Sequence, residues 1–381
     1  MLRKSAIFFF VTLLIVSMCP ITVFAEDSPK ISAKSAIVMG ADGHEVLFEK
    51  NVREKLPIAS TTKIMTSLLT LEAAEKNDKT VTITDEMVRV EGSSMGLRAG
   101  NRITLKSLAE GMLAVSGNDA ANSAAIAVGG SLSGFADLMN KKALSLGMKD
   151  THYVTPSGLD DKNHYSSAYD LALLASTAMD NKDFSDIVGK KIIKVHFESP
   201  DEMRTYKNHN KLLTMYDCCN GVKTGFTKKS GRCLVSSAEK NGVRIIAVTL
   251  SDPCDWEDHQ KLLDYGFSKL ENIKIDDSSF SVSLPVTGGN KEAVTVAGTE
   301  GENIVVLRSS KKNLQRCVQL PRFVYAPVSN GEVLGNVCYS LNGKTVAESD
   351  LIAKGDIGFM HIKKNFIEEI VDKIKFSLFY R

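Results

Sequence analysis

A serine and a lysine stand three residues apart in the segment Ser60-Thr61-Thr62-Lys63, ahead of a stretch with helical periodicity. Residues three apart on a helix share a face, so the two side chains should meet. A serine hydroxyl is a weak nucleophile until a neighbouring base accepts its proton, and a partly neutral lysine can do this. Because a lysine titrates near about 10.4 in water, burial or a nearby cation must lower its pKa. Taken alone, the pattern also fits a serine that caps a helix beside a surface lysine.

Two further short motifs carry groups that could complete such a site. Ser116 and Asn118 place a hydroxyl and a carboxamide close together, which suits proton relay and hydrogen bonding to a substrate. Lys223, Thr224 and Gly225 open a predicted strand. The lysine is the candidate cation near Lys63, the threonine hydroxyl could bind a carboxylate, and the glycine would let a substrate backbone approach the strand edge. Each motif alone also fits an ordinary turn or edge strand.

The elements that must hold these motifs follow from hydrophobic spacing and turn residues. Residues 32–50 predict a hairpin, because an Asp-Gly pair supplies the positive φ angles of a tight turn. The spacing of apolar residues from 60 to about 75 predicts a helix, and the Ala-rich residues 104–147 predict a cluster of helices. Strands are expected at 222–226, 233–238 and 243–250, and a helix at 256–270. The sequence therefore predicts an α/β (α+β) domain over 26–275, with an antiparallel sheet and a separate block of helices.

Residues 276–360 change to short apolar runs separated by glycine turns, which is typical of a small all-β domain. Strands are expected at 281–286, 293–296, 304–307, 317–320 and 333–339. Cys317 and Cys338 fall in this segment and could form a disulfide. Their spacing leaves a bridge and two buried, unpaired thiols equally open.

In residues 363–381, apolar and charged residues alternate with the period of an amphipathic helix. The charged residues are five basic and three acidic ones. So many charges exclude a bilayer span, but the apolar face could lie in the membrane interface with its cations toward anionic lipid. Packing on the protein's own core is the alternative. We expect residues 361–381 to be a peripheral membrane anchor.

The first residues predict export. Arg3 and Lys4 precede an uncharged, mostly apolar run, and residues 23–25 have the small-x-small spacing of a signal-peptidase site. We expect residues 1–25 to be a signal peptide, since Pro20 breaks the apolar run before a retained membrane helix could form. The mature protein would then lie on the outer face of the cytoplasmic membrane.

Composition excludes several classes of function. The chain has 381 residues with 43% apolar and 24% charged residues, which suits a globular protein with a large core. Its formal charge of +2 disappears with the two cations of the leader, so we expect no nucleic-acid partner. Metal-ligand spacings such as H-E-x-x-H and C-x-x-C do not occur, so we expect no metal and no cofactor.

In this order, the three motifs are typical of penicillin-binding proteins and class A β-lactamases. The chain resembles the D-alanyl-D-alanine carboxypeptidases, which are the low-molecular-mass penicillin-binding proteins of peptidase family S11. The likeness covers about residues 30–270 and is carried by the segments 56–66, 116–121, 138–140, 157–161 and 221–227. It implies a penicillin-binding/β-lactamase-like transpeptidase domain, and the β domain and terminal helix also fit the family's layout.

The resemblance also implies roles for the first two motifs. Ser60 would be the nucleophile that becomes an acyl-ester, and Lys63 would be its general base. Ser116 and Asn118 would complete the proton network and hold the substrate amide. The substrate would be a peptidoglycan stem peptide ending in D-Ala-D-Ala, and β-lactams would acylate the same serine.

For the third motif, the resemblance implies substrate binding. Lys223 would tune the electrostatics of the site, and Thr224 would help to bind the terminal carboxylate beside Gly225. The backbone N–H groups of Ser60 and Phe226 would form the oxyanion hole.

Two positions depart from the family's pattern. Phe226 stands where many relatives carry a histidine, which implies a more apolar rim. His209 stands where some relatives place an arginine between paired asparagines, which implies weaker or more pH-dependent carboxylate binding.

Three other functions compete with this reading. A class A β-lactamase would need a glutamate between the second and third motifs, and residues 111–197 contain none. A D,D-endopeptidase would use the same residues to cut cross-links. A catalytically silent wall-binding protein is disfavoured, because every motif residue is present.

Overall fold

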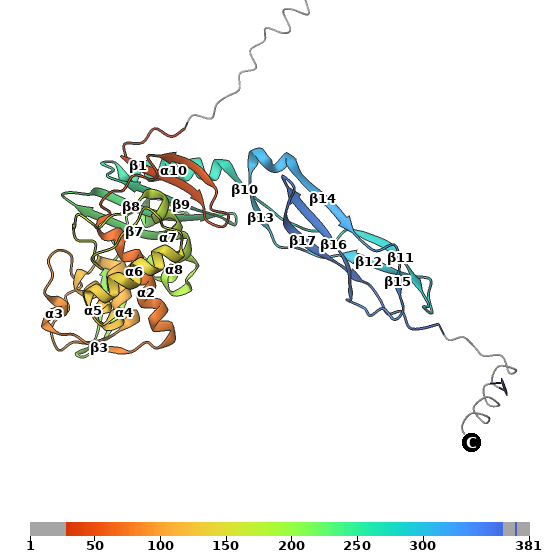
Figure 1. Cartoon of the computed structure of the whole chain (residues 1–381), viewed down its shortest axis with the longest axis horizontal. Coiled ribbons are helices and arrows are strands. Elements are labelled where there is room, and N and C mark those ends of the chain that lie inside the picture. The colour runs from red at the N-terminus through yellow and green to blue at the C-terminus, as the bar shows by residue number, and fades with distance from the viewer. Residues whose placement is uncertain (1–27, 361–369, 372–381) are drawn as a thin grey trace, which may run out of the picture.

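The computed structural model describes residues 28–360 and 370–371. Figure 1 shows two bodies joined end to end, a mixed body of helices and strands followed by a body of β-strands. The predicted signal peptide lies outside the described residues, as does the predicted terminal helix apart from residues 370 and 371. None of the helices within the described ranges is long and apolar enough to cross a membrane.

An antiparallel five-stranded sheet forms the centre of the mixed body, in the order β2-β1-β9-β8-β7. The strands are β1 (Ser35–Gly40), β2 (Val46–Lys50), β7 (Cys219–Thr227), β8 (Gly231–Lys240) and β9 (Val243–Leu250). The predicted hairpin and the three predicted strands are confirmed, with ends that differ by a few residues. The order of strands leaves β7, which carries the third motif, at the edge of this sheet.

Helices cover both faces of this sheet. The predicted final helix is α10 (Asp255–Lys269), and it packs on one face, while α7 (Ala168–Asp180) packs on the other. Successive side chains of a strand point to opposite faces, so Ile37 and Met39 of β1 join the core beneath the helical block and Val38 joins the core beneath α10. Every residue of β1 is therefore buried.

The helical block contains the predicted cluster and sits beside the sheet. Its helices are α2 (Lys63–Lys76), α3 (Asp85–Val88), α4 (Leu105–Val115), α5 (Asn118–Gly129), α6 (Leu132–Ser145), α7 and α8 (Lys182–Val188). The chain breaks between α4 and α5 at Ser116, which has a φ of 63° in the left-handed region. This break places the second motif in the short turn between two helices.

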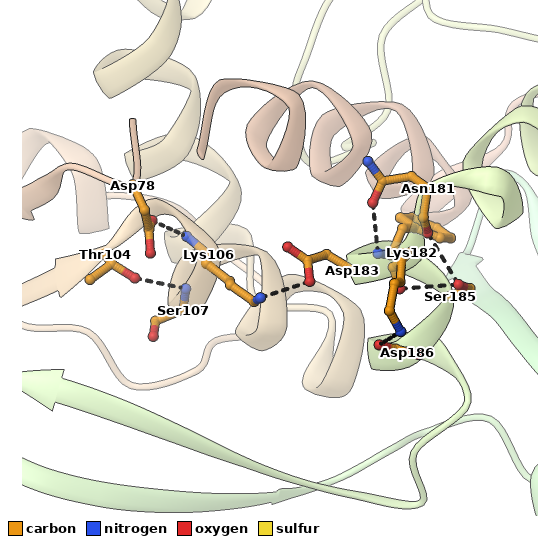
Figure 2. Close-up of polar contacts among 10 residues, drawn as sticks. Asp78, Thr104, Lys106, Ser107, Asn181, Lys182, Asp183, Ser185 and Asp186 are labelled. Atoms are coloured by element: carbon orange, nitrogen blue, oxygen red, sulfur yellow. Dashed lines mark hydrogen bonds and ion pairs between the residues drawn. The ribbon is translucent and has the colours of Figure 1, made fainter. Parts of the chain in front are cut away.

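Polar contacts fix the outer side of this block, as Figure 2 shows. Lys106 of α4 donates a hydrogen bond to Asp183 of α8 at 2.7 Å, and this bond raises the pKa of Lys106. Thr104 caps α4 by accepting a bond from the backbone N–H of Ser107 at 3.2 Å, and Asp78 accepts one from the N–H of Lys106 at 2.9 Å. These bonds satisfy donors at the first turn of α4 and tie the helix to its neighbours.

Several short elements of the mixed body are not predicted from the sequence. They are the antiparallel pair β3 (Thr80–Thr82) with β4 (Arg102–Thr104), the hairpin β5 (Ile192–Glu198) with β6 (Asp201–Lys207), and the helix α9 (Leu212–Met215). The β5–β6 hairpin holds the loop before α4: the Tyr206 hydroxyl donates to the Met95 carbonyl at 2.7 Å, and Arg204 donates to that of Gly96 at 2.9 Å.

The second body is an all-β unit, as predicted. Its sheet has the order β14-β16-β17-β12-β11-β15, and a separate pair, β10 with β13, leads into it from the mixed body. A 3-10 helix, Arg308–Asn313, follows β13. The strands are β10 (Leu270–Ile273), β11 (Ser281–Thr287), β12 (Ala293–Gly298), β13 (Ile304–Leu307), β14 (Leu314–Gln319), β15 (Val324–Tyr325), β16 (Val333–Leu341) and β17 (Lys344–Ala353).

The two cysteines of this body are direct neighbours. Cys317 of β14 and Cys338 of β16 are paired in register, so their side chains lie on the same face. Both thiols are free, as are the other four cysteines of the described part of the chain. The structure therefore shows two unpaired thiols, of which Cys338 is buried as expected and Cys317 is exposed.

Candidate active site

Lys63 lies at the centre of the site, fully buried at the start of α2. Its Nζ is 3.0 Å from Ser60 Oγ, 2.7 Å from Asn118 Oδ1 and 2.6 Å from the Ser157 carbonyl oxygen. Burial and the nearby Lys223 cation hold the pKa of Lys63 well below its usual value. A neutral amine in this position has a lone pair that can accept the proton of Ser60.

Ser60 sits in a strained turn rather than at an ordinary helix cap. It belongs to a 3-10 turn, Ala59–Thr62, and Ala59 just before it has a φ of 46°. Gly158 makes room for this turn, because a Cβ at residue 158 would lie 1.9 Å from the Ala59 carbonyl oxygen. The serine is thereby presented at the start of α2 and turned toward the edge strand β7.

Ser116 and Asn118 approach the pair from the turn between α4 and α5. The Asn118 side chain is fixed at both ends, because its Nδ2 donates to the Glu91 carbonyl at 2.6 Å while its Oδ1 accepts from Lys63. Ser116 Oγ is buried and has no hydrogen-bond partner among the described residues. A buried hydroxyl without a partner costs free energy, so it is ready to bond to a ligand that enters.

Lys223 and Thr224 come from β7 and lie on opposite faces of that strand. Lys223 is buried, its Nζ donates to the Thr224 carbonyl at 2.9 Å, and burial lowers the pKa of Lys223 to about 7. Gly225 brings β7 against the serine turn, because a Cβ at residue 225 would lie 3.0 Å from the backbone nitrogen of Ser60. Phe226 is 65% exposed, so its side chain lies on the rim.

These elements enclose a cavity of about 280 Å³. Five predicted site residues line it, namely Ser60, Ser116, Thr224, Gly225 and Phe226. The other three predicted residues, Lys63, Asn118 and Lys223, are buried behind its wall, and the first two bond to one another. The structure thus brings all eight predicted residues to one place. Across the described ranges, no cluster of three or more His, Cys, Asp and Glu side chains could hold a metal ion.

The sequence did not reveal a second group of cavity residues, Ser93, Arg232, Asp255 and Trp256. Arg232 stands opposite Phe226 across β7 and β8. Its Nε donates to buried Asp255 at 2.9 Å, and its guanidinium lies 5.5 Å from the centre of the Trp256 ring. The Ser-Gly turn after β7 could have suggested Arg232, since a tight turn fixes which residues face each other. No sequence pattern near Asp255 indicates that this residue belongs to the site.

His209 also lines the cavity, where the family's pattern has an arginine. Its side chain is exposed at the rim, and desolvation together with the Lys223 charge lowers the pKa of His209. At neutral pH its imidazole is therefore uncharged, so it supplies no fixed cation to this wall of the cavity.

An antiparallel sheet whose edge strand packs against a Ser-x-x-Lys pair, with the lysine buried and the serine facing a cavity, indicates the penicillin-binding class of serine hydrolases. Within that class, the chain belongs to the D-alanyl-D-alanine carboxypeptidases of peptidase family S11, which residues 22–254 match. Residues 270–358 match the C-terminal domain of penicillin-binding protein 5.

Individual relatives are similar in sequence to this chain over most of its length. It is 33% identical over 335 residues to "D-alanyl-D-alanine carboxypeptidase DacF" of Bacillus subtilis, covering 85% of this chain and 86% of the relative. It is 33% identical over 351 residues to "D-alanyl-D-alanine carboxypeptidase DacC" of Escherichia coli, covering 87% of this chain and 86% of the relative.

Solved structures confirm the fold. Penicillin-binding protein 5 of Haemophilus influenzae matches with a TM-score of 0.63 and 28% identity, over 87% of this chain and 99% of that one. The Streptomyces K15 DD-transpeptidase matches with a TM-score of 0.59 and 31% identity, over 64% of this chain and 99% of that one. The predicted fold class and family are confirmed, and the chain is a serine-type D-alanyl-D-alanine carboxypeptidase.

Proposed function

We propose that Ser60 is the nucleophile of this carboxypeptidase and Lys63 its general base. The observation that carries the proposal is the 3.0 Å contact between Ser60 Oγ and the buried amine of Lys63. An amine that is neutral for part of the time, held at hydrogen-bond distance from a hydroxyl, is the requirement for activating serine without a histidine.

The reaction then runs in two stages. Ser60 Oγ attacks the carbonyl carbon of the last peptide bond as its proton passes to Lys63 Nζ. The proton is then delivered to the amine of the leaving D-alanine, the C–N bond breaks, and an ester remains on Ser60. Water hydrolyses the ester, which releases the shortened peptide and restores the hydroxyl.

The charge that develops on the carbonyl oxygen needs two donors. We assign them to the backbone N–H groups of Ser60 and Phe226. The close approach of β7 to the serine turn at Gly225 supports this assignment, because it places strand backbone beside the nitrogen of Ser60. Such preorganised donors stabilise the transition state more than the ground state.

Ser116 and Asn118 complete the proton path and hold the substrate amide. The unpartnered Oγ of Ser116 supports this role, because an entering substrate would supply the partner that the free enzyme lacks. Asn118 keeps the Lys63 amine directed at the cavity through its own bond to that amine.

The free carboxylate of the last D-alanine would bind at the opposite wall. Thr224 offers a hydroxyl there, and Lys223 adds positive charge from behind the strand. Arg232 offers its terminal guanidinium nitrogens, since only its Nε is used by Asp255 in the described contacts. A guanidinium matches a carboxylate in shape and charge, so Arg232 compensates for the uncharged His209.

The substrate we propose is a peptidoglycan stem peptide that ends in D-Ala-D-Ala, and β-lactams would acylate the same serine. We also propose that residues 1–25 direct export, that 26–275 and 276–360 are the two domains, and that 361–381 hold the enzyme at the outer face of the cytoplasmic membrane. The basic, amphipathic sequence of the last segment supports the anchor.

Fluorescent penicillin and purified muropeptides test the proposal together. The wild-type chain should bind the label covalently and release terminal D-alanine, and Ser60→Ala should do neither. Ser133→Ala, an exposed serine of α6, is the matched control and should behave as wild type. Labelling of Ser60→Ala would show that another residue is the nucleophile. Cleavage of cross-linked dimers without release of terminal D-alanine would indicate an endopeptidase instead.

A further inference from the structure

Large apolar side chains stand exposed at one end of the β body. Phe323, Tyr325, Phe359 and Met360 are 45%, 69%, 62% and 61% exposed. We call these four residues the apolar tip. Single exposed apolar residues are common on protein surfaces, but several large ones at one end of a domain indicate a surface that meets a partner.

Backbone bonds bring the tip together from distant parts of the sequence. Tyr325 is paired with Thr287 at the end of β11, and Phe359 is paired with Gly289 just beyond it. Met360 continues this contact, since its N–H donates to the Gly288 carbonyl at 2.9 Å. Phe323 packs edge-to-face on Tyr325 with ring centres 5.4 Å apart. The tip is thus built on the sheet rather than on a single loose loop.

The side chains of the tip lie outside the buried core of the β body. Val286, Val328 and Ile357 come from the same three segments and are buried beneath them. The four tip residues are not among the side chains that form or cover this core, and they face solvent instead.

The position of the tip indicates what covers it. Figure 1 shows β11 and β15 at the end of the β body that lies away from the mixed body, which carries the active-site cavity. Met360 is the last residue of the β body that the structure describes, and the predicted amphipathic segment follows it in the sequence. Whatever surface that segment binds would lie next to the tip.

We propose that the apolar tip inserts into the interfacial layer of an anionic lipid bilayer, beside the terminal anchor. This inference rests on the membrane anchor proposed above. Aromatic side chains favour the boundary between headgroups and acyl chains, and Arg322 directly before Phe323 would face the lipid phosphates. The tip and the terminal anchor would together orient the long axis of the β body away from the membrane plane. The cavity, which belongs to the mixed body, would then lie at a distance from the bilayer.

The single tryptophan of the chain provides an internal control for the test. Trp256 lines the active-site cavity, far along the chain from the tip. The full chain is mixed with phosphatidylglycerol–phosphatidylcholine vesicles whose acyl chains carry bromine, which quenches tryptophan only within the bilayer. Wild-type fluorescence from Trp256 should not change. The double variant W256F/F359W should lose about half of its fluorescence or more, as expected for an aromatic ring at interfacial depth.

Two further variants separate the tip from other apolar residues of the β body. W256F/V346W places the reporter at an exposed position of β17 outside the tip and should not be quenched. Replacing Phe323, Tyr325 and Phe359 together by serine should weaken vesicle binding by about tenfold or more, while Val282→Ser with Val346→Ser should not. Melting curves that match wild type show that each variant is folded.

The outcomes distinguish this inference from the anchor on which it depends. If the full chain binds vesicles but the fluorescence of W256F/F359W is not quenched, the tip does not enter the bilayer. The inference is then wrong, while the proposed terminal anchor is still supported. If the full chain does not bind vesicles, both proposals are wrong. If the tip variants change only a self-association seen by sedimentation, the tip is covered by a second copy of the chain and the inference is overturned.

Discussion

At the scale of single residues, the Lys63 amine is controlled by what surrounds it. Burial is the largest cause of its lowered pKa, and the cation of Lys223 is the second. Below that pKa the amine is protonated and cannot accept the Ser60 proton, so acylation should rise as the pH passes upward through it. The charge on Lys223 therefore helps to keep the Lys63 amine neutral.

This coupling predicts a shift in a pH profile. Lys223→Met removes one cause of the low pKa of Lys63, so the rise in the acylation rate should move to higher pH. Lys223→Arg keeps a cation at this position, so the acylation rate should rise over the same pH range as in the wild type. The measurement is the acylation rate with a chromogenic cephalosporin as a function of pH. Identical profiles for the Met and Arg variants would contradict the coupling.

Arg232 makes a second prediction at this scale. Arg232→Gln should lower kcat/KM about 10- to 100-fold for a peptide with a free terminal carboxylate, because charge-assisted hydrogen bonds of about 1.5–3 kcal/mol are lost. The same peptide with a terminal amide should be affected much less. Arg244→Gln, which breaks an ion pair with Asp180 on another part of the body, is the control. Equal losses for acid and amide would exclude carboxylate binding.

At the scale of elements, the site depends on how closely β7 approaches the serine turn. Gly225 permits contact with the backbone of residues 58–61, since a Cβ there would lie 3.0 Å from three backbone atoms. Such contacts are tighter than side chains normally make, so a methyl group would push the strand and the turn apart.

Gly225→Ala should therefore reduce acylation about 100-fold or more, the loss typical of a disturbed oxyanion hole, with the protein still folded. Gly43→Ala is the matched control, because nothing lies within 4 Å of a Cβ at that position. The acylation rates of both variants measure the effect on catalysis, and their melting temperatures show whether each variant is folded. A Gly225→Ala enzyme with wild-type acylation would show that the close approach is unnecessary.

The elements also show what could be predicted from the sequence. The strands at 222–226, 233–238 and 243–250 were predictable, because apolar runs are separated by Ser-Gly and Asn-Gly turns. Strand β17 was not, since Glu348 and Asp350 interrupt its apolar pattern. In the site, the motif side chains were predictable from their types, whereas the Ser157 carbonyl that binds Lys63 is a backbone group with no sequence signal.

At the scale of the whole molecule, the catalytic cavity and the segment that we propose as the membrane anchor belong to opposite ends of the protein. The cavity belongs to the mixed body. Met360, the last described residue before the predicted anchor, bonds to Gly288 directly after β11, and Figure 1 shows β11 at the far end of the β body. Because none of the described residues that line the cavity comes from the second body, membrane attachment and catalysis should be separable.

Deleting residues 363–381 should consequently release most of the enzyme from anionic vesicles and leave kcat/KM on a soluble peptide unchanged. A variant with the same residues reordered to remove the apolar face keeps length and charge, and it should also be released. Vesicle co-sedimentation and a D-alanine release assay measure the two properties. A truncated chain that binds vesicles as strongly as wild type would contradict the anchor.

The most direct test of the central claim is the mass of the protein after reaction with a β-lactam. The account predicts that the wild-type chain gains the mass of one β-lactam, that digestion locates the adduct on the peptide containing Ser60, and that Ser60→Ala gains nothing. An adduct that persists in Ser60→Ala, or that maps to a different serine in the wild-type chain, would contradict it.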